Sequence, residues 1–227
     1  MPAAAHLSRR PIIEPMRRDA STVVVLAGET GEDLLAALGR APNVSLVRPQ
    51  ERGGDPLPAA AAALREASRR SSSYALVPED PLAAVAAAWQ AMWDVTRGPG
   101  GDAEFEREAA EAVTAWRTGQ FELPDYYLVL AGSGEEGQAG FHLGPLRATR
   151  PHRVAVVTPA PSGGGTERPS DGRERYAAVL HALGSLRHGP WWPPLDELIG
   201  AARRFYPGGL VEGEAARGAL LVPGDVR

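Results

Sequence analysis

The chain contains no cysteine and no lysine among its 227 residues. Without cysteine it can form no disulfide, thiolate nucleophile, thiolate zinc site or iron–sulfur cluster. Without lysine it has no P-loop lysine, no Schiff-base lysine and no kinase-type phosphate lysine. All 24 basic residues are arginines. This bias, together with abundant Ala, Gly and Pro, is typical of a GC-rich bacterial genome and reports codon usage rather than arginine chemistry.

Long apolar runs and an excess of positive charge are also missing. No window approaches the roughly 18 apolar residues that a membrane span needs, and residues 1–20 contain no apolar stretch of signal-peptide length. The formal net charge of −4 argues against dedicated nucleic-acid or anionic-membrane binding. We therefore expect a cytoplasmic protein whose partners are small molecules, other proteins or further copies of itself.

The composition sets the expected domain organisation. Hydrophobic residues make up 44% of the chain, but 39 residues are alanine, and 26 glycines and 21 prolines indicate long irregular connections. A chain of this length still buries a sizeable core. We expect a flexible leader at 1–20, a single α/β domain at 21–210 and a C-terminal tail at 211–227, with any sub-domain break near 96–102.

Apolar strand-like runs alternate with amphipathic helical stretches along the chain. This alternation predicts a three-layer α/β sandwich with a mainly parallel, Rossmann-like sheet. In the helix expected after Asp80, for example, Leu82, Val85, Trp89 and Trp93 recur with helical spacing. Antiparallel strands are compatible with the second half, around 141–157. Strands are expected at 22–27, 44–47, 74–77, 126–131, 141–143 and 154–157, and the last two helices at 176–186 and 195–205.

Two acidic segments follow predicted strands, where parallel sheets place their ligands. The first holds Glu29 and Thr30, and the second holds Glu79 and Asp80. The glycine-containing turn at Glu29 and Thr30 could hold a nucleotide phosphate, and the carboxylates of Glu79 and Asp80 could hold a ribose hydroxyl or Mg²⁺. Local rules also explain both segments. Thr30 and Asp33 fit a helix-capping arrangement, and Asp80 directly before a proline is a good N-cap. Capping is the favoured interpretation of both segments, and ligand binding is the alternative.

A basic segment near the middle of the chain is the best candidate for binding an anion. It holds His142, Arg147, Arg150 and Arg153, and arginine pairs bidentately with phosphate or carboxylate groups. A solvated turn that balances nearby acids is the favoured interpretation of this segment, and anion binding is the alternative. No two of the five histidines have the spacing of a helical zinc site, so we expect no metal site, and no cofactor is indicated. Ser133 follows a strand but lacks the G-x-S-x-G pattern and a predicted helix.

The adjacent pair Trp191 and Trp192 lies in a proline-rich segment that cannot be helical. Exposed aromatic residues on a rigid loop are typical partner anchors, whereas buried ones fill a gap between helices. Two functions follow from these features. The favoured one is a non-catalytic protein-interaction or assembly module that uses the tryptophan loop. The alternative is an enzyme or sensor that binds an anionic or nucleotide-like small molecule at the carboxyl edge of the sheet.

Overall fold

The computed structural model describes residues 21–28, 30–48, 56–93, 101–130, 136–158 and 171–205. The predicted leader, most of the predicted break near 96–102 and the C-terminal tail lie outside these ranges, as does Glu29. Within them, no helix combines the length and the apolar character that crossing a membrane requires.

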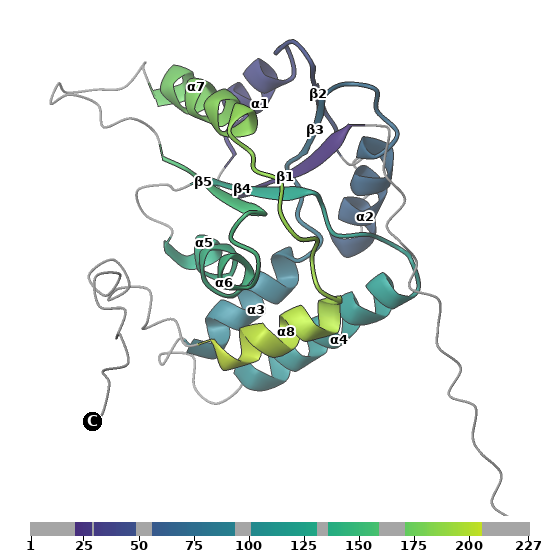
Figure 1. Cartoon of the computed structure of the whole chain (residues 1–227). Coiled ribbons are helices and arrows are strands. Elements are labelled where there is room, and N and C mark those ends of the chain that lie inside the picture. The colour runs from purple at the N-terminus through teal and green to yellow at the C-terminus, as the bar shows by residue number, and fades with distance from the viewer. Residues whose placement is uncertain are drawn as a thin grey trace, which may run out of the picture.

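The core of the fold is a five-stranded sheet in which all strands are parallel (Figure 1). The strand order is β2-β3-β1-β4-β5, so β1 lies at the centre between β3 and β4. The two central strands are apolar over nearly their whole length, as expected for strands covered on both faces. The strands are β1 (Thr22–Gly28), β2 (Val44–Leu46), β3 (Tyr74–Val77), β4 (Tyr126–Leu130) and β5 (Val154–Val157).

Helices cover both faces of the sheet and give three layers (Figure 1). Alternate residues of β1 show the division, because Val24 and Leu26 pack with α1 and α7, whereas Val23 and Val25 face the larger helical layer. The smaller layer consists of α1 (Glu32–Leu38) and α7 (Asp171–Gly184). The larger layer consists of α2 (Pro56–Ala67), α3 (Ala83–Trp93), α4 (Gly101–Arg117), α5 (Glu136–Phe141), the π-helix η1 (His142–Leu146), α6 (Arg147–Thr149) and α8 (Leu195–Arg204). The predicted α/β sandwich is confirmed.

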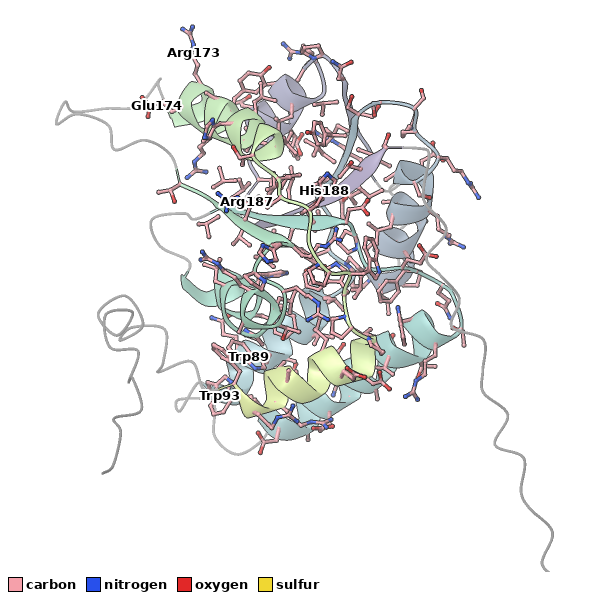
Figure 2. The ribbon with its side chains drawn as sticks, in the orientation of Figure 1. Trp89, Trp93, Arg173, Glu174, Arg187 and His188 are labelled. Carbon is pink, nitrogen blue, oxygen red and sulfur yellow. The ribbon has the colours of Figure 1, made fainter. Side chains whose placement is uncertain are left out.

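Trp89 ties the helices of the larger layer together. Its side chain is 1% exposed, and its indole Nε1 donates a hydrogen bond of 2.8 Å to the carbonyl of Ala202 in α8. The rings of Trp93, Phe141 and Phe205 surround it, with centroids 5.9 to 6.4 Å away. Figure 2 shows Trp89 and Trp93 on α3 beside α8. The predicted apolar stripe of α3 therefore faces the core.

The prediction of a strand at 141–143 is wrong. Phe141 ends α5 and His142 begins the π-helix η1, so this stretch is helical, and β5 pairs with β4 in parallel rather than antiparallel fashion. A three-residue alternation is too short to separate the two periodicities. The wide turn of the π-helix also buries the consecutive residues Gly144, Pro145 and Leu146, a pattern that helical spacing alone does not predict. A helix, α5, therefore does follow β4 beyond Ser133, which itself lies outside the described residues.

The predicted capping of α1 by Thr30 is wrong by one residue. The N-cap is Gly31, which makes no side-chain capping bond, while Glu32 and Asp33 lie in the first turn, where acids favour the helix dipole. Gly28 ends β1 with φ of +104°, and a Cβ atom there would lie 2.8 Å from the carbonyl oxygen of Leu130. Only glycine fits this position, because both the dihedral angle and the close approach exclude a side chain.

Candidate functional site

The carboxyl edge of the sheet gathers most of the acidic candidates. Because the strands are parallel, the residues after β1, β2 and β3 emerge at one edge, and these include Thr30, Arg48, Glu79 and Asp80. The connection from β1 leads towards β2 on one side of the sheet, whereas the connection from β4 leads towards β5 on the other. Such a reversal of direction marks the crevice where open α/β sheets bind ligands.

Asp80 caps α3, as the sequence predicts. Its Oδ1 atom accepts a hydrogen bond of 2.9 Å from the backbone amide of Leu82, directly before the helix. The same atom accepts a hydrogen bond of 3.2 Å from the hydroxyl of Tyr127 on β4. The carboxylate is thus held by both the backbone and a core side chain, and its orientation is fixed.

His142 forms the third contact of the Asp80 carboxylate. Its Nε2 atom lies 2.7 Å from Oδ2, and the side chains of His142 and Asp80 are only 5% and 6% exposed. The imidazole packs on the ring of Tyr127 at 5.1 Å between centroids. Burial raises the pKa of Tyr127 well above its usual value, and the nearby negative charge of Asp80 adds to this effect. The phenol therefore stays neutral and acts as a hydrogen-bond donor.

The carboxylate of Glu79, the residue before Asp80, is not fully hydrogen-bonded within the described part of the chain. Its Oε2 atom is buried and has no hydrogen-bond partner in the described part of the chain. Burial raises the pKa of Glu79, whereas its own backbone and the charge of Arg48 lower it. Arg48 offsets the rise in the pKa of Glu79 only in part, because its guanidinium is paired with the carboxylate of Glu32 at 2.7 Å. The negative charge of Glu32 itself raises the pKa of Glu79.

The predicted arginines do not join this group. His142 starts η1 near the carboxyl edge, but the chain then runs through Arg147 in α6 to the start of β5, so Arg150 and Arg153 lie at the opposite, amino edge of the sheet. The structure therefore brings Asp80, His142 and Glu79 together and separates them from Arg150 and Arg153. An anion-binding pocket built from both predicted groups is not present among the described residues.

Arg150 and Arg153 hold the segment that joins α7 to α8. This segment, residues 186–194, is called the strap below, because it runs across the amino edge from one helical layer to the other (Figure 1). Arg153, which is 8% exposed, donates hydrogen bonds to the carbonyls of Gly189 (2.8 Å), Pro190 (3.1 Å) and Asp125 (3.2 Å). Arg150 Nε donates to the carbonyl of Trp191 at 2.6 Å.

The two tryptophans of the strap have different environments. Trp192 is 6% exposed, its indole donates a hydrogen bond of 2.7 Å to the carbonyl of Pro124, and its ring meets Tyr127 edge to face. Trp191 is 36% exposed, and the guanidinium carbon of Arg153 lies over its indole ring, 4.7 Å from the centroid of that ring. Trp192 is therefore a core residue, whereas Trp191 presents its ring to solvent.

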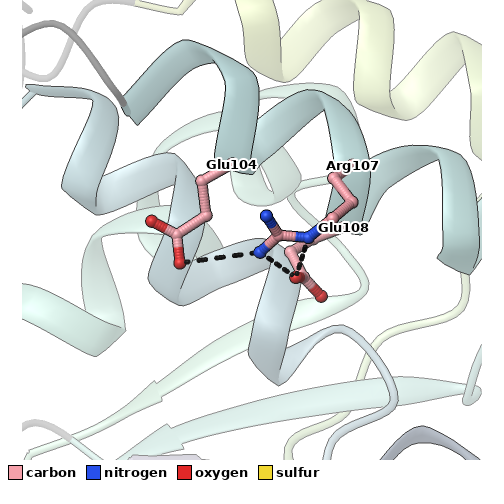
Figure 3. A network of polar contacts seen from close by, with 3 residues as sticks. All are labelled: Glu104, Arg107 and Glu108. Atoms are coloured by element: carbon pink, nitrogen blue, oxygen red, sulfur yellow. Dashed lines mark hydrogen bonds and ion pairs between the residues drawn. The ribbon is translucent and has the colours of Figure 1, made fainter.

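Other polar clusters in the described ranges do not form a site. No group of three or more His, Asp or Glu side chains there could hold a metal ion. Glu104, Arg107 and Glu108 contact one another, but they lie on a single stretch of α4 (Figure 3). Exposed pairs within a helix are ordinary surface contacts.

Sequence reasoning missed two members of the carboxyl-edge group. Tyr127 reads as an ordinary residue of an apolar strand, although a buried tyrosine needs a partner for its hydroxyl, and that requirement is the signal. Arg48 follows β2 and belongs to no recognisable sequence motif. Only the strand order brings it near Glu79. No protein-family model, no curated protein and no solved structure matches this chain.

Proposed function

We propose that this chain binds a small molecule bearing hydroxyl or amine groups at the carboxyl edge of the sheet, with Glu79 in direct contact. The observation that carries the proposal is the buried Oε2 atom of Glu79, which has no donor in the described part of the chain. A buried acceptor without a donor is unfavourable by about 1–3 kcal/mol, and native proteins retain such groups mainly where a ligand, water or reaction uses them.

The charge of this edge favours a neutral or cationic ligand over an anion. Glu32, Asp33, Glu79 and Asp80 all lie at or next to it, and Arg48 is already paired with Glu32. Because Arg150 and Arg153 are at the amino edge, neither of these two predicted arginines is available at the carboxyl edge to bind a phosphate. We therefore propose a ligand that donates hydrogen bonds in place of the anionic or nucleotide-like ligand of the sequence-based alternative.

The Asp80–His142 pair stabilises the position of Glu79 without contacting the ligand itself. Their side chains are too buried for direct ligand contact, but they fix the end of β3 against η1 and so fix the position of Glu79, the residue before Asp80. If the ligand is a substrate, Glu79 is the group suited to exchange a proton with it, because its carboxylate faces the ligand and burial raises its pKa above the usual value of a glutamate.

Calorimetric titration of the whole chain with three probes tests the proposal: D-ribose, adenosine and spermidine, with inorganic phosphate as the anionic comparison. We expect at least one donor-bearing probe to bind, Glu79→Gln to weaken it about tenfold or more, and phosphate not to bind. Glu111→Gln, at an exposed acid on α4, is the matched control and leaves affinity unchanged. Binding of phosphate alone, or equal affinity in Glu79→Gln, contradicts the proposal.

A further inference from the structure

The strap presents a rigid aromatic side chain at the amino edge of the sheet. Trp191 is the large hydrophobic residue that stands exposed in the part of the chain the structure describes. The guanidinium of Arg153 is stacked against it at 4.7 Å and against the Tyr126 ring at 5.1 Å. The carbonyl of Trp191 is held by Arg150, so both its ring and its backbone are ordered before any partner binds. Preordering of this kind lowers the entropic cost of association.

The surroundings of Trp191 are basic. The strap contributes the exposed side chains of Arg187 and His188, which Figure 2 labels together on this segment. The exposed His152 lies against the strap at Gly189, where an added Cβ atom would be 2.7 Å from its side chain. Neither the strap nor the neighbouring segment 147–153 contains an acidic residue. The charged side chains of these two segments are therefore all basic, on a chain whose net charge is −4.

The backbone of the strap is fixed along its length. The hydroxyl of Tyr126 donates to the carbonyl of Arg187 at 3.2 Å, Arg153 donates to the carbonyls of Gly189 and Pro190, and Trp192 is inserted in the core. The exposed side chains of Arg187 and His188 are thus carried on an ordered backbone. Exposed tryptophan and arginine residues on such scaffolds are the residue types most often found at the centre of protein interfaces.

We propose that the strap docks an acidic segment of another protein, with Asp and Glu side chains on Arg187 and His188 and an apolar side chain on Trp191. Carboxylates match the bidentate geometry of a guanidinium, and an apolar residue between them matches the indole face. An acidic protein segment is favoured over a nucleic acid, because the remaining surface of an acidic chain repels a long phosphate backbone. This proposal does not depend on the ligand at the carboxyl edge.

Fluorescence anisotropy with the full chain tests the docking proposal. The probe is a labelled peptide of Asp, Glu and Leu, and the comparison is a peptide of Asn, Gln and Leu in the same order. We expect the acidic peptide alone to bind, with affinity that falls as NaCl rises from about 50 to 300 mM, because salt screens surface charges. Trp191→Ala and the double variant Arg187→Ala/His188→Ala are each expected to lower affinity about tenfold.

Arg173→Ala is the matched control, since Arg173 is an exposed arginine at the start of α7, away from Arg187 and His188 (Figure 2). Circular dichroism of each variant confirms that it is folded. Equal binding of both peptides, or full affinity in Trp191→Ala, overturns the proposal. Tighter binding of a single-stranded RNA of matched charge also overturns the proposal, because it identifies a nucleic acid as the occupant. A dimer in sedimentation that Trp191→Ala dissociates overturns it too, because it identifies a second copy of the chain as the occupant.

Discussion

The Nε2 atom of His142 lies 2.7 Å from Oδ2 of Asp80, although 62 residues separate them in the chain. The contact joins the carboxyl end of β3 to the first residue of the π-helix, and both side chains are almost fully buried. The pair thus helps to hold the π-helix, which follows β4 in the chain, over the edge of the sheet. Because π-helical turns often occur at functional sites, this pair is the natural target for the first substitutions.

Asp80→Ala is expected to lower the free energy of unfolding by about 3 kcal/mol, because it leaves the donors of His142, Tyr127 and Leu82 without their acceptor. Asp80→Asn is expected to be milder by about 1 kcal/mol, since asparagine is as good an N-cap and keeps one acceptor oxygen. Urea denaturation measures both values. Asp33→Asn, at an exposed acid in the first turn of α1, is the control. Equal losses in the two Asp80 variants would show that capping contributes little.

Glu79→Gln is expected to raise the melting temperature at neutral pH. The pKa of Glu79 is raised in the folded chain, so the folded state binds this proton more tightly than the unfolded state, and its contribution to stability falls as pH rises above the unfolded value near 4.5. Glutamine resembles the protonated carboxyl and removes this loss. The gain should therefore vanish below about pH 4.5. Melting curves between pH 4 and pH 8 measure it, and a gain independent of pH would contradict the assignment.

The sheet and most helices could be predicted because their signals are local. Strand β3 coincides with its expected range, and Asp80 caps α3 as expected. Buried parallel strands read as short β-branched runs, and caps follow from single residues. These features depend on residues within a few positions of one another, so the chain order alone reveals them.

The candidate site was predictable only in part, because it depends on strand order. His142 and Arg153 are close in sequence and both basic, so the sequence predicts one patch that they form with Arg147 and Arg150. The structure instead directs His142 to Asp80 at one edge and Arg153 to the strap at the other. No local signal distinguishes these destinations, since the separation arises from the π-helix between them and from parallel pairing of β4 with β5.

Arg153→Lys is expected to destabilise the chain by about 2–3 kcal/mol despite keeping the charge, because an ammonium cannot reproduce the fork that binds three carbonyls at once. Hydrogen exchange should also accelerate at the amides of Arg187, His188 and Gly189, where the strap loosens. Arg173→Lys on α7 is the control for the loss of an arginine as such. Unchanged exchange in the strap would show that Trp192 alone holds it in place.

The two neighbouring tryptophans should respond in opposite ways to truncation. Trp192→Ala is expected to lower the free energy of unfolding by about 3–5 kcal/mol, because it opens a cavity beside Tyr127 and leaves the carbonyl of Pro124 without its donor. Trp191→Ala removes a half-exposed ring and a cation–π contact, so a loss of about 0.5–1 kcal/mol is expected. Denaturant titrations of the two variants, each the control of the other, measure the difference. A loss in Trp191→Ala as large as that in Trp192→Ala would show that both rings serve the core and would leave the strap without an exposed anchor.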